Sequence, residues 1–256
     1  MNSRASQLQA FDRLLTIMDE LREQCPWDKK QTMESLRLLT IEEVYELGDA
    51  ILTQDLYEIK NELGDLFLHL VFYSKIGSEK ESFDVADVLN SVCEKLIHRH
   101  PHIYGDVEVA DEDEVKRNWE QLKLKEGKKS VLAGVPKGLP AMVKAFRMQE
   151  KAKGVGFEFD NAEDTLAKVK EEIAEFEEEN DPILREKEMG DILFSMINYA
   201  RFVGINPENA LEKTNQKFLQ RFKKMESLSE DRNLVFSKLT LEEQDKLWIE
   251  TKKYFS

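Results

Sequence analysis

Glu188-Met189-Gly190-Asp191, taken together with the preceding Glu172-Ile173-Ala174-Glu175, decides the fold of this chain. Each quartet places two carboxylates three residues apart, and on a helix that spacing puts both on one face. Two such helices packed side by side would direct four carboxylates at one another. Like charges that converge in this way repel unless a cation lies among them, so the two quartets predict a metal site.

The residues around the second quartet favour a half-buried helix over a fully solvated one. ExxE and ExxD patterns are common on exposed helix faces, and a single quartet would be interpreted in that way. Here apolar side chains follow one another at helical spacing: Met189, Ile192, Leu193, Met196 and Ile197. Glu188 and Asp191 lie at the edge of this stripe. Carboxylate oxygens without His or Cys suit a hard ion, which indicates Mg²⁺, with Mn²⁺ as the alternative.

Composition excludes several classes of function. The 256 residues include 37 basic and 51 acidic side chains, a formal charge of −14, which argues against nucleic acid as the main partner. A small phosphate ligand held through a metal remains compatible with this charge. Two cysteines, Cys25 and Cys93, indicate a reducing compartment without disulfides. The sequence has no apolar signal core and no run long enough to span a bilayer, so we expect a soluble, cytoplasmic protein.

An internal repeat defines the domain organisation. Glu43-Val44-Tyr45-Glu46 and Glu62-Leu63-Gly64-Asp65 reproduce both quartets in the first half of the chain, at a nearly constant offset. Further downstream, Lys95 and Arg99 parallel Lys217 and Arg221, and Trp119 parallels Trp248. Carboxylates, cations and a tryptophan therefore recur in the same order. The chain is predicted to hold two tandem copies of one helical-bundle domain.

The predicted boundaries place the first domain at 1–126 and the second at 139–256. Residues 127–138 are rich in glycine and other helix breakers and form the predicted linker. Apolar periodicity and breakers predict helices over about 8–24, 32–52, 84–99 and 111–127, with another that begins after Asp55. No run alternates with the period of a strand, so the fold class is all-α, with about five helices per copy.

Capping signals mark the helices of the second copy. Asp160 or Asn161 is expected to cap the helix that carries Glu172. Asp181-Pro182 and Asn206-Pro207 each place a capping side chain before a proline at the first helical position. Thr240 with Glu243 forms a capping box for the last helix.

These motifs resemble those of the all-α nucleoside triphosphate pyrophosphohydrolases. ExxE followed by ExxD on paired helices is the signature of that family, and the tandem arrangement is similar to its MazG group. Five motifs carry the resemblance: Cys-Pro-Trp-Asp (25–28), Glu-Leu-Gly-Asp (62–65), His-Arg-His-Pro-His (98–102), Val-Gly-Phe (155–157) and Glu-Met-Gly-Asp (188–191). The resemblance implies Mg²⁺-dependent hydrolysis of ribo- and deoxynucleoside triphosphates to a monophosphate and pyrophosphate. It also implies broad tolerance of bases, a homodimer, and a second copy that is the better catalyst.

The same resemblance assigns the site residues. Metal binding falls to the second-copy carboxylates, Glu172, Glu175, Glu188 and Asp191, and with less support to their first-copy counterparts, Glu43, Glu46, Glu62 and Asp65. Contacts to the nucleotide map onto Lys168, Lys217, Arg221 and Trp248.

Elementary chemistry agrees with these assignments. Lys217 and Arg221 lie one helical turn apart and would hold the negative triphosphate, although a basic surface patch would look the same. Trp248 would stack on a base, and its alternative role is core packing. Bound metal lowers the pKa of a water molecule, and Glu171 or Glu172 would orient or deprotonate that water.

The two copies differ at two informative positions. Asn198 lies two helical turns beyond Asp191, where an amide would reach a ligand, whereas the first copy has Phe72 there. Lys168 has Leu39 as its counterpart. The second site is therefore predicted to be the more complete one, while the first keeps its carboxylates and binds metal with weaker or different activity.

Two alternative functions remain open at this stage. A carboxylate-bridged di-iron bundle would require Glu-x-x-His on two helices, and neither quartet contains the histidine. A module that binds nucleotides as a sensor, without turnover, would carry the same residues. An assay for pyrophosphate release separates these readings.

Overall fold

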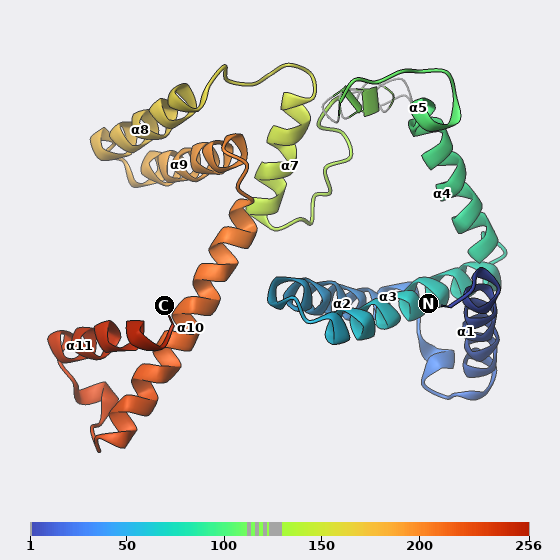
Figure 1. Cartoon of the computed structure of the whole chain (residues 1–256), viewed down its shortest axis with the longest axis horizontal. Coiled ribbons are helices and arrows are strands. Elements are labelled where there is room, and N and C mark those ends of the chain that lie inside the picture. Colours follow the sequence, from blue (N-terminus) through green and yellow to red (C-terminus); the bar gives the residue numbers. More distant parts are fainter. Residues whose placement is uncertain (1, 112–113, 116–117, 120–121, 123–129, 256) are drawn as a thin grey trace. The chain divides into compact units, whose positions relative to one another are not determined.

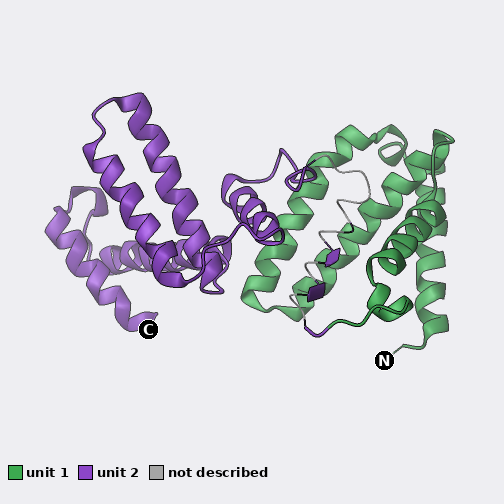
Figure 2. Cartoon of the chain, turned by 90° about the horizontal axis from the view of Figure 1, so that it is seen from above, with its two compact units in different colours: residues 1–109 green, residues 110–256 purple. Residues whose placement is uncertain are grey.

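The computed structural model describes residues 2–255 except 112–113, 116–117, 120–121 and 123–129. Every regular element of the described residues is a helix (Figure 1), which confirms the predicted all-α fold class. The chain divides into two compact units, unit 1 with residues 1–109 and unit 2 with residues 110–256 (Figure 2). Much of the predicted helix 111–127 and the start of the predicted linker lie outside the described residues, so the boundary at 126 stays a prediction.

Unit 1 contains the helices predicted from its apolar periodicity. They are α1 (Arg4–Gln24), α2 (Met33–Thr53), α3 (Leu56–Glu79) and α4 (Val85–Arg99). The 3₁₀ turn η1 (Asp28–Lys30) and the short α5 (Pro101–Tyr104) were not predicted. The first helix begins four residues earlier than its apolar stripe because Ser3 accepts a hydrogen bond from the backbone N–H of Ser6 and caps it.

A tight turn joins α2 to α3 and makes them a helical hairpin (Figure 1). Gln54 ends α2 in the left-handed region, with φ of 59°. Asp55 then caps α3 by accepting hydrogen bonds from the backbone N–H groups of Tyr57 and Glu58. The hairpin packs on α1 around a buried apolar cluster: Met18, Leu36, Val71, Phe72 and Ile76.

Unit 2 repeats the central hairpin of unit 1. Its elements are α7 (Ala141–Lys153), α8 (Ala162–Glu178), α9 (Pro182–Phe202), α10 (Pro207–Asp231), η2 (Phe236–Lys238), α11 (Leu241–Thr251) and η3 (Lys252–Tyr254). The helices α8 and α9 lie side by side, as α2 and α3 do in unit 1, and α7 packs against α9 (Figure 1).

The predicted capping signals act as expected in unit 2. Asn161, and not Asp160, caps α8, with its side chain accepting from the N–H of Asp164. Asp181 and Asn206 cap α9 and α10, each before a proline. Thr240 forms the predicted capping box of α11 with Glu243. These caps set the register of α8 against α9, and therefore which carboxylates meet.

A second cluster joins α10 to α11, away from the hairpin. Met225, Leu228 and Leu247 are buried there, and Trp248 packs against them. In the part of the chain that the structure describes, no helix is both long and apolar enough to cross a membrane.

Candidate active site

Three carboxylates from the two helices of the unit 2 hairpin converge. Glu172 on α8 and Glu188 and Asp191 on α9 each offer an oxygen, and these oxygens lie within 4.8 Å of one another. In unit 1, Glu43, Glu62 and Asp65 form a matching group under the same limit. The hairpin geometry therefore brings together three members of each predicted set of four.

The fourth carboxylate of each set lies outside the tight group but acts on it electrostatically. Desolvation raises the pKa of Glu175, and the charge of Glu172 raises it further. In unit 1 the charge of Glu46 contributes to the raised pKa values of both Glu43 and Glu62. Glu175 in unit 2 and Glu46 in unit 1 therefore lie at the edge of their sites.

Lys168 supplies the positive charge next to the unit 2 carboxylates. Its Nζ lies 2.8 Å from Oε1 of Glu172 and 2.7 Å from Oε1 of Glu171, so the lysine joins the two predicted catalytic residues. Glu172 is buried, with 6% of its surface exposed. The hydrogen bonds to Glu171 and Glu172 raise the pKa of the Lys168 ammonium, which keeps it charged.

Unit 1 has no such lysine at the matching position, where Leu39 packs against the apolar core instead. Desolvation raises the pKa of Glu43, and the charges of Asp65 and Glu46 raise it further. The pKa of Glu62 is raised by desolvation and by the same neighbouring carboxylates. One oxygen of Glu62 is buried and has no hydrogen-bond partner among the described residues.

Both groups fit a divalent cation by the chemistry of their donors. All of the donors are carboxylate oxygens, which suit Mg²⁺ or Mn²⁺. A cation between the helices would give the buried, unpartnered oxygen of Glu62 a partner. It would also lower the raised carboxylate pKa values in both units.

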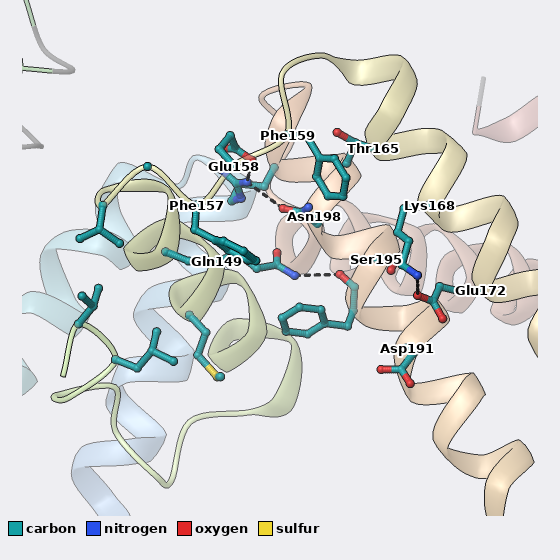
Figure 3. A pocket seen from close by; sticks show the side chains of 18 residues that line it. Gln149, Phe157, Glu158, Phe159, Thr165, Lys168, Glu172, Asp191, Ser195 and Asn198 are labelled. Atoms are coloured by element: carbon teal, nitrogen blue, oxygen red, sulfur yellow. Dashed lines mark hydrogen bonds and ion pairs between the residues drawn. The ribbon is translucent and has the colours of Figure 1, made fainter.

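A pocket of about 700 Å³ opens beside the carboxylates of unit 2 (Figure 3). Apart from Lys168, Glu172 and Asp191, its main lining residues are Leu132, Met148, Gln149, Val155, Phe157, Phe159, Thr165, Phe194, Asn198 and Arg201. Figure 3 shows Lys168, Glu172 and Asp191 toward one end and Gln149 and Phe157 toward the other. The volume lies within the range of cavities that hold a small molecule, and a charged end joined to a largely apolar remainder suits an amphipathic ligand.

Arg201 fixes the polar wall of this pocket. Its guanidinium, which is 8% exposed, donates a 2.8 Å hydrogen bond to Oδ1 of Asn198 and a second bond to Oε1 of Glu158. Because Oδ1 of Asn198 accepts from Arg201, the amide NH₂ is the remaining polar group of that side chain, and it can act only as a donor.

The matching positions of unit 1 are filled with apolar side chains. Leu36 and Phe72 occupy the places of Thr165 and Asn198, and each is 1% exposed in the core. Leu39 likewise takes the place of Lys168. Three positions that line the unit 2 pocket, Thr165, Lys168 and Asn198, therefore correspond to apolar core residues in unit 1. A smaller cavity of about 260 Å³ lies in unit 1, and five of its seven lining residues carry a carboxylate: Glu46, Asp49, Asp55, Glu58 and Glu62.

The remaining predicted nucleotide ligands lie on α10 and α11, apart from the lining of the pocket. The guanidinium of Arg221 lies over the ring of Trp248, 3.7 Å from its centroid, and donates to the backbone oxygen of Trp248 and to Oγ1 of Thr251. Lys217 lies one turn before Arg221 on the same helix. Arg221 and Trp248 have structural partners within one chain, and the contact of all three residues with a nucleotide stays a prediction.

Sequence reasoning missed three residues of the pocket. Gln149 is on α7, Phe157 is in the loop before α8, and Arg201 follows Asn198 by three residues on α9. A signal existed for Arg201, since a charged residue on an apolar helical stripe requires partners. The loop contains the Val-Gly-Phe motif (155–157), for which no site role was predicted, and no sequence pattern links α7 to the carboxylates.

Comparisons with known proteins find relatives of this chain. Residues 31–104, in unit 1, match the family described as the MazG nucleotide pyrophosphohydrolase domain. The nucleoside triphosphate pyrophosphohydrolase/pyrophosphatase MazG of Thermotoga maritima is 42% identical over 247 residues, which covers 94% of this chain and 95% of that protein. A solved structure of a mazG-related protein from Thermotoga maritima is 26% identical and covers 44% of this chain and 98% of that one, with a TM-score of 0.40.

A further relative extends the match across almost the whole chain. The nucleoside triphosphate pyrophosphohydrolase of Escherichia coli K12 is 38% identical over 255 residues, covering 95% of this chain and 97% of that protein. With the tandem hairpins and their converging carboxylates, these full-length matches show that the chain belongs to the MazG family of nucleoside triphosphate pyrophosphohydrolases.

Proposed function

We propose that the α8–α9 site of unit 2 hydrolyses nucleoside triphosphates to a nucleoside monophosphate and pyrophosphate, with Mg²⁺ as the metal and Mn²⁺ as a substitute. The proposal rests on one observation: the converging carboxylates, the Lys168 ammonium and the 700 Å³ pocket lie next to one another in unit 2. A charged end and an apolar remainder match the triphosphate and the base of a nucleotide.

The carboxylates of the hairpin would hold the metal. Glu172, Glu188 and Asp191 provide the converging oxygens, and Glu175 lies at the edge of the group. When bound, the metal neutralises phosphate charge and makes a water molecule a better nucleophile at neutral pH. The products require that water adds to phosphorus and that the bridge between the α and β phosphates breaks.

The protein's own side chains would position the reactants. Lys168, held by Glu171 and Glu172, lies where a phosphate oxygen would arrive, and it would donate a charge-assisted hydrogen bond. Glu171, whose side chain is 56% exposed against 8% for that of Glu172, is the residue proposed to orient or deprotonate the water. The aromatic rings of Phe157, Phe159 and Phe194 offer surfaces on which any base would stack, which supports broad base tolerance.

The chain is proposed to work as a homodimer. Ile173, Leu193 and Met196 on the α8–α9 hairpin are 39%, 54% and 46% exposed, which is high for apolar side chains that flank a site. An isologous partner would cover them. Lys217, Arg221 and Trp248, which lie outside the lining of the pocket, are proposed to contact nucleotide in that assembly.

Product analysis tests the proposal. The purified chain is incubated with Mg²⁺ and a mixed pool of ribo- and deoxynucleoside triphosphates, and monophosphate and pyrophosphate are quantified. Equal amounts of the two products, abolished by EDTA, are expected. Diphosphate with inorganic phosphate would refute the proposed bond cleavage, and nucleotide binding without any product would identify a sensor instead.

A further inference from the structure

Two residues that line the unit 2 pocket, Gln149 and Arg201, each have a buried side-chain atom without a hydrogen-bond partner among the described residues, Oε1 and Nε respectively, and only the first is an acceptor. Gln149 is 6% exposed, and its Oε1 has no hydrogen-bond partner in the described part of the chain. An unpaired buried acceptor costs free energy, so it is expected to gain a donor when the pocket fills.

The orientation of this amide follows from its other bond. Nε2 of Gln149 donates a 2.9 Å hydrogen bond to the backbone oxygen of Phe194 (Figure 3). A carbonyl oxygen only accepts, so the NH₂ of the amide must be on that side and the oxygen on the other. The amide of Gln149 is therefore fixed with its oxygen as an unpaired acceptor, on a side chain that lines the pocket.

The pocket also presents a donor. Arg201 donates to Oδ1 of Asn198, which leaves the Asn198 NH₂ as a donor along the same pocket. One fixed acceptor and one fixed donor therefore line the part of the pocket beyond Lys168 and Glu172.

A nucleobase matches this pair of groups. The Watson–Crick edges of adenine, guanine, cytosine, uracil and thymine each carry at least one N–H donor next to an acceptor, although the order differs among the bases. A site that requires only one donor and one acceptor would accept all of them, and it would reject a base that has no N–H donor at all.

We propose that Gln149 is a specificity-determining residue that accepts a hydrogen bond from an N–H of the substrate's base, with the base stacked on the phenylalanines of the pocket. This inference rests on the proposed hydrolysis at the unit 2 site. It assigns Gln149 a role outside the metal carboxylates and the phosphate-binding cations.

The test compares two pairs of triphosphates that differ by one amino group. ATP is paired with purine riboside triphosphate, which lacks the exocyclic amine and so has no N–H donor on its base. CTP is paired with the triphosphate of pyrimidin-2-one riboside, which lacks the 4-amino group. For the unaltered chain, kcat/KM is expected to fall roughly tenfold to a hundredfold in each pair, because the analogue leaves the Gln149 oxygen buried and unpaired.

Gln149→Met removes the acceptor with little change in side-chain volume. The ratio of kcat/KM within each pair should fall to about one in this variant, while Gln9→Met, an exposed glutamine of α1, should keep the ratio of the unaltered chain. Gln149→Leu provides a second apolar replacement should the methionine variant fold poorly. Because the readout is a ratio between two substrates, a merely structural role of Gln149 would change both rates and leave the ratio unaltered.

Two results would overturn the inference while hydrolysis stands. One is equal kcat/KM for ATP and purine riboside triphosphate in the unaltered chain. The other is an undiminished ratio in the Gln149 variants. Failure of the proposed function is a separate outcome, because no pyrophosphate would then be released from ATP itself.

Discussion

The ammonium of Lys168 lies 2.8 Å from Oε1 of Glu172, one turn along α8, and this pair joins the carboxylates of unit 2 to the adjoining pocket. In the absence of a metal ion, the Lys168 ammonium neutralises the charge of the buried Glu172 carboxylate. At the matching position of unit 1, Leu39 packs into the apolar core, and the pKa of Glu43 is raised. The two hairpins therefore differ in the charge that lies next to their converging carboxylates at the Lys168 and Leu39 positions.

Replacement of Lys168 by methionine should lower kcat/KM for ATP roughly tenfold to a hundredfold. The lost contact is a charge-assisted hydrogen bond to a phosphate oxygen, on the order of 1.5–3 kcal/mol. Steady-state kinetics at saturating Mg²⁺ measures the effect. Lys170→Met, an exposed lysine of the same helix, is the matched control. Equal activity of the two variants would remove Lys168 from the substrate site.

Amide substitutions of the converging carboxylates should lower activity without lowering the stability of the fold. Glu172→Gln and Asp191→Asn each remove one charge from a repelling group, so the melting temperature in EDTA should stay the same or rise. Pyrophosphate release should fall on the order of a hundredfold or more, because a metal ligand is lost. Glu177→Gln, exposed on α8, serves as the control. Near-normal turnover of either site variant at saturating Mg²⁺ would refute the metal assignment.

The pH dependence of stability tests the metal-free unit 1 group. Desolvation and the charges of Asp65 and Glu46 raise the pKa of Glu43 in the folded chain. Between the ordinary glutamate pKa and this raised value the folded state binds more protons than the unfolded state, so the free energy of unfolding falls as pH rises through that window. At neutral pH the resulting destabilisation is fully present.

Glu43→Gln, which does not titrate, should therefore melt at a higher temperature than the unaltered chain in EDTA at pH 7.5. The difference should shrink as the pH is lowered through the raised pKa and below the ordinary glutamate pKa, where Glu43 is protonated in both states. Thermal unfolding followed by circular dichroism measures it, with Glu20→Gln on α1 as an exposed control. A difference that grows toward acid pH would contradict the repulsion.

The assembly prediction concerns mass in solution. Light scattering at micromolar concentration should give twice the 29.9 kDa of one chain, because the exposed apolar side chains of the α8–α9 hairpin require cover. A mass of 29.9 kDa throughout that concentration range would rule out the proposed homodimer.

Local signals in the sequence were sufficient to predict α8, α9, α10 and α11, whereas α7 was not predicted. Asp181-Pro182, Asn206-Pro207 and the Thr240–Glu243 box act on their own backbone within a few residues, so their effect is visible without the fold. The quartets were also informative, because a helix places residues three apart on one face regardless of what packs against it.

The pocket could not be predicted because it depends on packing between distant segments. Gln149 on α7 is fixed by the backbone oxygen of Phe194 on α9, a partner 45 residues away. A backbone acceptor leaves no mark in the sequence. The repeat revealed the difference between Phe72 and Asn198, but the pair Leu36 and Thr165 was recognised only once Thr165 was found to line the pocket.

The most direct test of the central claim, that unit 2 holds the hydrolytic site, compares two double variants across several triphosphates. Glu172→Gln with Asp191→Asn should remove most pyrophosphate release for every nucleotide. Glu43→Gln with Glu46→Gln should remove little, because unit 1 has apolar core where unit 2 has Lys168 and the pocket. Equal losses from the two double variants with every nucleotide would contradict the account and indicate two working sites per chain.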